Sequence, residues 1–251
     1  MESEVLSLLC DPDTRYEFEL EGSTLRNTAT GRVYPIRDDI PLFVSTLTGL
    51  NLKHQSLYDR IAPGYDLAET LSRLIKRKPN FRREIIAELE IEPEARVLEV
   101  GAGTGANLRL LPENIDFYGI DLSWGMLRKF RKNLRKWNRS AHLFQGEAAR
   151  LPFRADVFDC VFHMVGIRFF SDPGRAIREM IWVAKPGTRI VIADEIEKVV
   201  QQNEQKKALV SEAVRSPIDL VPKEMQEIES REIADGKLYC LTFRKPAAAI
   251  R

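Results

Sequence analysis

The sequence predicts an α/β protein whose central sheet is mainly parallel. Between residues 96 and 215, short apolar runs alternate with segments of helical spacing, which is typical of a parallel sheet covered by helices. Two later strand-like runs, 227–233 and 237–244, are joined at Asp235-Gly236, a hairpin signal that predicts an antiparallel end to the sheet. The composition of 44% hydrophobic and 30% charged residues excludes a disordered chain or a fibre.

The first fifty residues predict a small β-rich unit before the main sheet. Residues 16–20 alternate apolar and acidic side chains, as a half-buried strand does, and residues 24–27 fit its return strand. Two prolines six residues apart then exclude a helix in the next segment. We therefore assign residues 1–48 to a β-rich segment and residues 49–251 to the main domain.

The main domain is expected to begin with a helical part, residues 49–92, and to continue as alternating strands and helices. Apolar residues three and four positions apart predict the first helices, and Lys78-Pro79 separates them. The predicted strands are 96–100, 115–120, 141–145, 157–165 and 188–193, and the predicted helices are 66–78, 81–91, 105–111, 124–137, 173–184 and 197–215.

Net charge and cysteine content limit which binding partners and which cellular compartment to expect. A formal net charge of +1 gives no overall attraction to nucleic acid or to an anionic membrane, so any such attraction would be local. The three cysteines are far apart and odd in number, which predicts reduced thiols and no disulfide framework. No apolar run approaches the roughly 18–20 residues that a membrane span needs, and the acidic start does not resemble a secretory signal. We therefore expect a cytoplasmic protein.

The most informative stretch is a glycine loop that joins the strand predicted at 96–100 to the segment after it. Residues 99–105 read EVGAGTG. Glycines allow backbone to approach a ligand closely, and a helix N-terminus offers unpaired N–H groups. The loop also satisfies the dinucleotide pattern G-x-G-x-x-G/A at residues 101–106. By itself it therefore fits a nicotinamide cofactor, another adenosine ligand, or a tight turn that merely needs small residues.

Three further features favour an adenosine ligand that also carries a positive group. Glu99 stands two residues before the first glycine, where a carboxylate suits a cation and would repel a pyrophosphate. Asp121 ends the next predicted strand, at the position of an acid that accepts ribose hydroxyls. The chain then reads GEA at 146–148, LPF at 151–153 and FDCV at 158–161, a series that dinucleotide enzymes do not require.

In this order and spacing, these residues resemble the class I methyltransferases that use S-adenosylmethionine. The resemblance is to the branch of the ubiquinone and menaquinone C-methyltransferases, methyltransferase type 11, and runs from about Tyr58 to Phe243. It includes Lys185-Pro186-Gly187, although Thr188 replaces the usual second glycine. The resemblance implies a Rossmann-like seven-stranded, mainly parallel sheet with an antiparallel last strand. It also implies methyl transfer from S-adenosylmethionine to a small molecule by in-line displacement.

The family's residue roles follow from the matching positions. The glycines pack under the methionine part of the cofactor, Glu99 faces its ammonium group, and Asp121 takes the ribose hydroxyls. Tyr58 and Tyr65 belong to a lid; Leu122 and Met126, which equally suit plain core packing, flank the adenine. The implied cofactor-binding set is Tyr58, Tyr65, Glu99, Gly101, Gly103, Gly105, Asp121, Leu122, Met126, Glu147, Ala148, His163 and Met164.

The catalytic candidates are His163 and Arg168. A sulfonium donor carries its own activation, so a general base is needed only if the acceptor must lose a proton. His163 is a candidate base, although a histidine on an apolar strand is also a common core residue. Arg168 could hold an anionic acceptor, or it could lie on the surface with its stem on Phe169.

The first forty residues resemble a zinc-ribbon domain that accompanies some methyltransferases, including ribosomal RNA guanine enzymes. Zinc in such a domain needs four Cys or His ligands. Of these only Cys10 remains, and Asp13, Asn27 and Thr30 stand at the other positions. Zinc favours thiolate and imidazole ligands, so we expect no metal in this segment.

The helix predicted at 124–137 is strongly basic and leaves a second function open. A solvated helix face is the simpler interpretation, and a patch for RNA or another anionic surface is the alternative. Methylation of a small molecule is therefore the first hypothesis, followed by RNA base methylation and by a non-catalytic regulatory protein that binds S-adenosylmethionine. A homodimer is compatible with the sequence. The basic residues are Arg128, Lys129, Arg131, Lys132, Arg135, Lys136 and Arg139.

Overall fold

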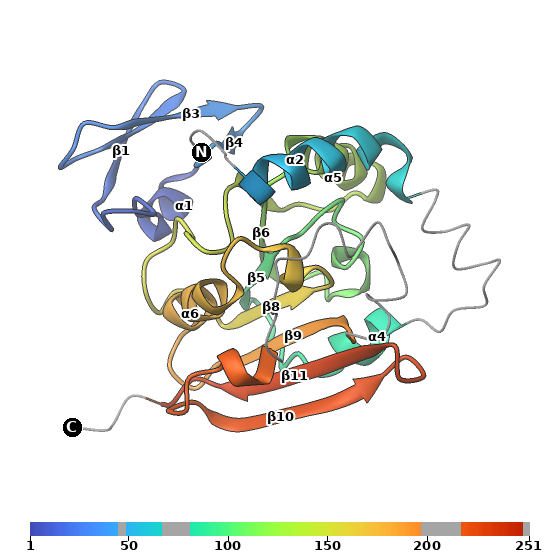
Figure 1. The fold of residues 1–251 in the computed structure, drawn as a ribbon. Coiled ribbons are helices and arrows are strands. Elements are labelled where there is room, and N and C mark those ends of the chain that lie inside the picture. Colours follow the sequence, from blue (N-terminus) through green and yellow to red (C-terminus); the bar gives the residue numbers. More distant parts are fainter. Residues whose placement is uncertain (45–48, 67–80, 197–216, 248–251) are drawn as a thin grey trace.

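The computed structural model describes residues 1–44, 49–66, 81–196 and 217–247. Its main element is a seven-stranded sheet with the strand order β10-β11-β9-β8-β5-β6-β7 (Figure 1). The strands are β5 (Arg96–Val100), β6 (Asp116–Asp121), β7 (His142–Gln145), β8 (Cys160–Met164), β9 (Arg189–Glu195), β10 (Gln226–Ile233) and β11 (Leu238–Arg244).

Strand direction confirms the predicted Rossmann-like sheet. Strands β5 to β9 pair in parallel, whereas β11 is antiparallel to both β9 and β10. The antiparallel strand therefore lies one place in from the edge, because the β10–β11 hairpin folds back to put β10 outermost. Residues Asp235 and Gly236 have positive φ angles of 56° and 69°, in agreement with the predicted tight turn.

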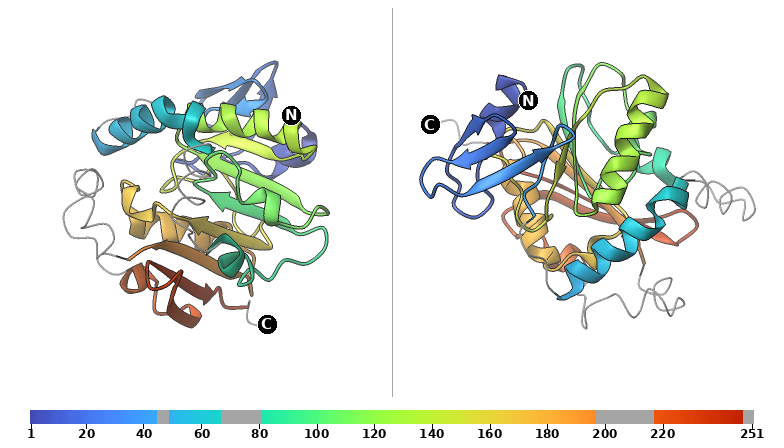
Figure 2. Two further views of the ribbon diagram at one scale, coloured as in Figure 1. Left: turned by 90° about the vertical axis from the view of Figure 1, so that its right-hand side faces the viewer. Right: turned by 90° about the horizontal axis from the view of Figure 1, so that it is seen from above.

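Helices cover both faces of this sheet (Figure 2). Helix α6 (Pro173–Val183) packs on one face, with Leu98 and Val100 of β5 in the same apolar cluster. Helices α4 (Phe81–Ile86) and α5 (Trp124–Trp137) pack on the other face, with Val97 in their cluster. This division follows from the two-residue period of a strand, which sends neighbouring side chains to opposite faces.

The helix predicted at 105–111 is wrong: the structure has only a single 3₁₀ turn, Leu108–Leu110. Gly101, Gly103 and Gly105 all have positive φ, so the glycine loop continues where the first helical turn was expected. At Gly105 a Cβ atom would lie 2.0 Å from the ring of Phe130, which makes this glycine a packing requirement. The helices predicted at 66–78 and 197–215 lie outside the described residues.

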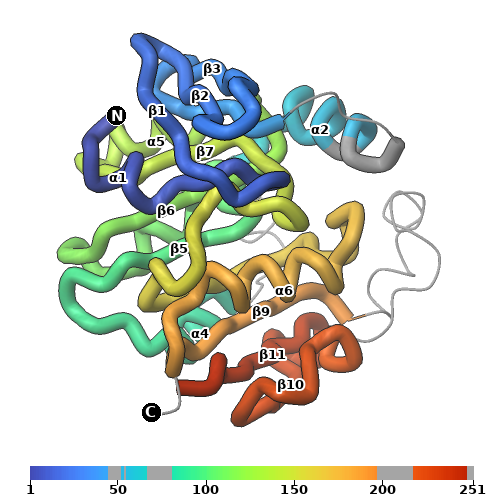
Figure 3. The backbone as a smooth tube through the Cα atoms, turned by 90° about the vertical axis from the view of Figure 1, so that its left-hand side faces the viewer, coloured from blue at the N-terminus to red at the C-terminus, as the bar shows by residue number. Residues whose placement is uncertain are grey.

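The N-terminal segment is a short helix and a four-stranded antiparallel sheet that pack against the β7 end of the main sheet (Figure 3). The amide of Phe43 donates to the carbonyl of Gln145 in β7 over 2.7 Å, and the amide of Cys10 donates to the carbonyl of Pro152. Leu25 and Tyr34 belong to the same apolar cluster as the main-sheet residues. The elements are α1 (Ser3–Leu8), β1 (Phe18–Glu21), β2 (Thr24–Asn27), β3 (Val33–Arg37) and β4 (Ile40–Pro41).

Helix α2 (Gly49–Ile61) and the 3₁₀ turn η1 (Ala62–Gly64) lie beside α5. Asp59 fixes this arrangement, because its Oδ1 accepts hydrogen bonds from the Ser123 hydroxyl at 2.6 Å and from the Gly125 amide at 2.7 Å. Ser123 is also the N-cap of α5. The end of α2 is thereby tied to the start of the basic helix. Within the ranges given above, no helix is long and apolar enough to cross a membrane.

Candidate functional site

A pocket of about 370 Å³ lies at the carboxyl ends of β5, β6 and β8 and reaches α2. This volume is typical of small-molecule sites. The position of the pocket also indicates a ligand site. In the sheet, β5 has β6 as its neighbour on one side and β8 on the other, so the strand order reverses at β5. Ligands of open α/β sheets bind outside the strand ends at such a switch point.

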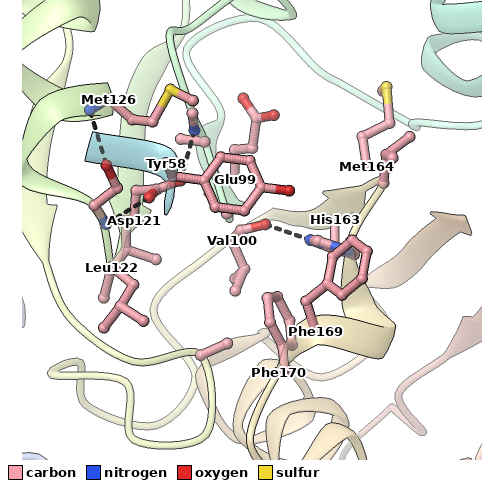
Figure 4. Close-up of a pocket in the computed structure, with 18 of the residues that line it drawn as sticks. Tyr58, Glu99, Val100, Asp121, Leu122, Met126, His163, Met164, Phe169 and Phe170 are labelled. Carbon is pink, nitrogen blue, oxygen red and sulfur yellow. Dashed lines mark hydrogen bonds between the residues drawn. The ribbon is translucent and has the colours of Figure 1, made fainter. Parts of the chain in front are cut away.

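Most of the predicted cofactor residues come together around this pocket. Figure 4 shows Asp121, Leu122 and Met126 on one side and His163 with Met164 on the other. Gly105 and Arg168 are not among the lining residues. The predicted residues that line the pocket are Tyr58, Tyr65, Glu99, Gly101, Gly103, Asp121, Leu122, Met126, Glu147, Ala148, His163 and Met164.

Asp121 is held in place by backbone donors at the end of β6. Its Oδ2 accepts a hydrogen bond from the Gly103 amide and its Oδ1 accepts one from the Ser123 amide, each 2.8 Å long. Burial raises the pKa of Asp121 to about 6, although these amide donors lower it. The group is mostly ionised at pH 7, and each oxygen has capacity to accept a further hydrogen bond from a ligand hydroxyl.

Glu99, at 1% exposure, is the most deeply buried acid of the pocket wall. Its Oε1 accepts a 2.5 Å hydrogen bond from the side-chain amide of Asn107, and Arg82 donates to the amide oxygen of Asn107. Its Oε2 is buried with no hydrogen-bond partner in the described part of the chain. Burial raises the pKa of Glu99 to about 8, against the lowering effects of Asn107 and Arg82. A buried acceptor without a donor is what a cationic ligand group would satisfy.

Asn107 and Arg82 are contributions that the sequence did not predict. Both line the pocket, and Arg82 comes from α4 rather than from the glycine loop. Asn107 stands eight residues after Glu99, and only the tight course of the loop brings its amide back to that carboxyl group. A polar residue shortly after a glycine loop was the available signal, but it does not indicate which group the side chain meets.

A strained turn after β8 forms the other side of the pocket. Val165 has a φ of +66°, which is rare for a β-branched residue and is typical of functional sites. Asp194 supports the turn, because its carboxylate accepts hydrogen bonds from the amides of Gly166 at 3.0 Å and Arg168 at 3.4 Å. The turn brings Phe169 and its neighbour Phe170 to the pocket wall, two aromatic residues that the sequence did not single out as site residues.

Arg168, which the sequence offered as a residue that could hold an anionic acceptor, is not among the residues that line the pocket. Its residue exposure is 7%, so it is also not the surface arginine of the alternative interpretation. Its Nε atom is buried without a hydrogen-bond partner in the resolved ranges.

The zinc-ligand positions of the N-terminal segment are used for other contacts. Asp13 pairs with Arg32 and Arg150, and the Oδ1 of Asn27 accepts 2.9 Å hydrogen bonds from the amides of Ala29 and Thr30. Cys10 is buried and free, like the other two cysteines. No group of His, Cys, Asp or Glu residues suited to a metal ion occurs among the residues that the structure describes.

The basic side chains of α5, together with Arg139 just after its C-cap, divide into two groups. Arg131 pairs with Asp38, Lys129 lies 3.7 Å from Asp66, and Arg139 donates to the carbonyl groups of residues 111 and 112. The second group is exposed and takes no part in lining the pocket: Arg128, Lys132, Arg135 and Lys136.

Comparison with known protein families shows which family the residues around this pocket match. Residues 98–192 match the family model of a methyltransferase domain. These residues form a class I methyltransferase domain. The match runs from Leu98 in β5 to Ile192 in β9, and thus includes the glycine loop, Glu99, Asp121 and His163. S-adenosylmethionine is the cofactor of this family, and the orphaned Glu99 oxygen and the fixed Asp121 carboxylate fit its ammonium and ribose groups.

Curated relatives of this methyltransferase domain carry similar names. The chain is 34% identical over 140 residues to a demethylmenaquinone methyltransferase of Streptomyces avermitilis, covering 55% of this chain and 58% of that protein. It is 32% identical over 155 residues to a ubiquinone/menaquinone biosynthesis C-methyltransferase of Geotalea daltonii, covering 59% and 65%. The chain thus spans less than two thirds of the length of these relatives.

Solved structures with the same fold perform different reactions. One is phosphoethanolamine N-methyltransferase 2 of Haemonchus contortus with S-adenosyl-L-methionine, with a TM-score of 0.56, 15% identity, and coverage of 66% of this chain and 52% of that one. Another is the (4+2)-cyclase SpnF, with a TM-score of 0.57, 19% identity, and coverage of 67% and 80%. These likenesses show the fold alone, and a shared fold does not determine the reaction.

Proposed function

We propose that this protein transfers a methyl group from S-adenosylmethionine to a small-molecule acceptor. The observation that carries the proposal is a pair of carboxyl groups on adjacent strands, of which Glu99 is buried and Asp121 is partly exposed. The Oε2 atom of Glu99 lacks a donor in the described chain, and Asp121 is fixed by two backbone amides. S-adenosylmethionine has an ammonium group for the first and two ribose hydroxyls for the second.

The chain's part in this reaction is alignment. The bound cofactor supplies a methyl group on a sulfonium sulfur, which needs no further activation. Gly101 and Gly103, with φ angles of +76° and +56°, give the loop a course that brings backbone close to the ligand. Asp121 and Glu99 fix the two ends of the cofactor, and this positioning lowers the entropic part of the barrier to in-line transfer.

A small acceptor suits the opposite side of the pocket better than RNA does. Phe169 and Phe170 face His163 there, next to the Tyr58 side chain of α2 (Figure 4). Aromatic walls exclude water and favour a compact apolar acceptor. The four exposed cations of α5 lie outside the pocket lining, so RNA methylation is the less favoured alternative.

The three buried free cysteines support a reducing compartment such as the cytoplasm.

A thermal-shift and methyl-uptake experiment tests the proposal. We expect S-adenosylmethionine and S-adenosylhomocysteine to raise the melting temperature, because a ligand that binds only the native state stabilises it. NAD(H) should give no shift. Labelled methyl groups should then pass to one or more phenols, quinols or amines and not to RNA. A shift with NAD(H) alone, or labelling of RNA alone, would contradict the proposal.

A further inference from the structure

The loop that follows β7, residues 146–153, forms part of the pocket wall. It lies on the Asp121 side, because Asp121 pairs in register with Gln145 and its carbonyl accepts a 3.1 Å hydrogen bond from the next amide along the loop. No helix or strand includes the lining residues of this loop, so contacts with other segments determine their course. These lining residues are Gly146, Glu147, Ala148 and Ala149.

The N-terminal segment binds this loop at both of its ends. At the start, the amide of Phe43 donates to the carbonyl of Gln145 over 2.7 Å, and Leu42 forms a parallel β-bridge with the same residue. At the far end, the amide of Cys10 donates to the carbonyl of Pro152 over 3.1 Å. The four residues that line the pocket therefore lie between two points at which the chain is attached to the N-terminal segment.

Arg15 and Glu179 fix the backbone of Leu151, two residues after the last lining residue. The Leu151 amide donates to Oε2 of Glu179 over 2.9 Å, and the Leu151 carbonyl accepts a 2.8 Å hydrogen bond from the Arg15 guanidinium. Arg15 also pairs with Oε1 of Glu179, which closes a ring of three polar contacts. We call this ring the Leu151 clamp. It satisfies both backbone groups of a residue that is fully buried.

Arg15 joins three parts of the molecule in this clamp. It belongs to the N-terminal segment, whereas Glu179 comes from α6 and Leu151 from the loop. Its own backbone has a φ of +64° and is held by a 2.9 Å hydrogen bond from its amide to the Asp11 carbonyl, a contact that does not use the Asp11 side chain. Its guanidinium lies 5.6 Å from the ring centre of Trp182. Because a guanidinium is a rigid fork, it can serve the carbonyl and the carboxylate together.

We infer that the N-terminal segment holds the cofactor-binding loop in place, with Arg15 as its positioning residue. This inference rests on the proposed binding of S-adenosylmethionine. The Leu151 clamp and the attachment at Gln145 give residues 146–149 their course before a ligand arrives. A ligand that meets an ordered loop loses no free energy in ordering it, so its affinity is higher. No residue of the described segment 1–44 lines the pocket, so the segment acts through the loop and not by contact with the cofactor.

The variant Arg15→Gln breaks the Leu151 clamp. Glutamine is uncharged and lacks the fork that serves two acceptors. We expect the Kd for S-adenosylmethionine to rise about 10-fold, as when the fraction of molecules with an ordered loop falls to about one tenth. Isothermal titration calorimetry measures the Kd at a temperature where circular dichroism shows both proteins folded. The matched control is Arg26→Gln, in β2 of the same segment, because Arg26 forms an exposed pair with Glu21 and its Kd should equal that of the wild type.

Two further readouts separate positioning of the loop from general packing. In the ligand-free protein, the amides of residues 147–149 should exchange with deuterium faster in Arg15→Gln than in the wild type, and saturating S-adenosylmethionine should restore slow exchange. In steady-state assays, KM for S-adenosylmethionine should rise with the Kd, while kcat at saturating cofactor stays close to that of the wild type.

The variant Glu179→Gln tests the clamp from its other side. It keeps an oxygen for the Leu151 amide and removes the charge that pairs with Arg15. We expect a similar rise in the Kd, and the double variant with Arg15→Gln should add little to either single change, because both remove the same contact. Should Arg15→Gln not fold, this isosteric variant decides the question by the same measurements.

The failure of this inference differs from the failure of the proposed function. If the wild type binds no S-adenosylmethionine, the proposed function is wrong. If the wild type binds it and Arg15→Gln has the same Kd and the same exchange at residues 147–149, the function stands and the N-terminal segment is a packing element only. An equal rise in the Kd for Arg26→Gln, or a fall in kcat at saturating cofactor with KM unchanged, would also overturn the inference.

Discussion

Two buried carboxyl groups, Asp11 in the N-terminal segment and Glu99 in the pocket, have opposite surroundings. Asp11 accepts hydrogen bonds from the amides of Asp13 and Thr14 and from the hydroxyl of Tyr34. Glu99 has a single donor, Asn107, and its second oxygen has none in the described ranges. Both groups are almost fully buried, at 0% and 1% exposure. Burial alone therefore does not decide what a buried acid does.

The pKa values of the two groups move in opposite directions for this reason. Burial tends to raise the pKa of Asp11, but hydrogen bonds from Asn27, Thr14, Tyr34 and Asp13 outweigh it, and the pKa lies below its ordinary value. Burial raises the pKa of Glu99 to about 8 because few donors oppose it. A satisfied carboxylate stabilises the fold, whereas a poorly satisfied one stabilises a complex that brings the missing partner.

The largest effect is expected from Asp11→Ala, which leaves the donors of Thr14 and Tyr34 without their acceptor. We expect the free energy of unfolding to fall by about 3 kcal/mol, because several buried donors lose their partner at once. Urea unfolding measures this change, and S-adenosylmethionine affinity at a temperature where the variant stays folded should be close to that of the wild type.

Asp13→Ala is the matched control, since Asp13 is exposed and forms only surface ion pairs, which contribute about 0–1 kcal/mol. A metal chelator should leave the wild-type unfolding curve in place, because hydrogen bonds hold the turn at Asp11. Equal destabilisation by the two alanine variants would show that the buried network is not what stabilises this segment.

Glu99→Gln should have the reverse pattern, with binding impaired and folding preserved. Glutamine keeps an oxygen for the Asn107 amide but removes the negative charge that a ligand ammonium requires. We expect the Kd for S-adenosylmethionine to rise by about 10- to 100-fold, as for the loss of a charged hydrogen bond. Isothermal titration calorimetry measures the Kd, and Glu113→Gln, an exposed acid outside the pocket, is the control. An unchanged Kd would mean that Glu99 faces no cationic group.

Much of the fold and the pocket could be predicted from the sequence, because these features depend on local pattern. Strand β5 and helix α5 have the predicted bounds, since the apolar spacing that predicts them is a local signal. The positions of Glu99 and Asp121 follow from where their strands end. By contrast, the Glu99–Asn107 hydrogen bond and the strained Val165 turn depend on chain reversals and on support from Asp194, a residue far along the sequence.

The N-terminal segment is a second place where the sequence pattern does not determine which side chains make the contacts. The ligand spacing drew attention to Asp13, but the buried network is built on its neighbour Asp11. Aspartate accepts hydrogen bonds from backbone two and three residues on only when the turn has the right conformation. Sequence spacing shows which residue types are near, and backbone conformation decides which of them turns inward.

The smallest expected effect is a proton released from Glu99 when the cofactor binds. In the free protein the carboxyl group, with a pKa of about 8, is mostly protonated at pH 7. An ammonium group beside it favours the ionised form, so binding should release close to one proton at pH 7, and affinity should increase from pH 6 to 8. Calorimetry at pH 7 in buffers of different ionisation enthalpy measures the number of protons released.

The direction of this pH dependence is fixed because the pKa of Glu99 in the folded, ligand-free protein lies above its ordinary value of 4.5. Its ionisation therefore destabilises the free protein as the pH rises towards 8, and a cationic ligand reverses this. Glu99→Gln should abolish the release; if the variant releases as many protons as the wild type, the proton comes from another group and the contrast with Asp11 does not extend to cofactor binding.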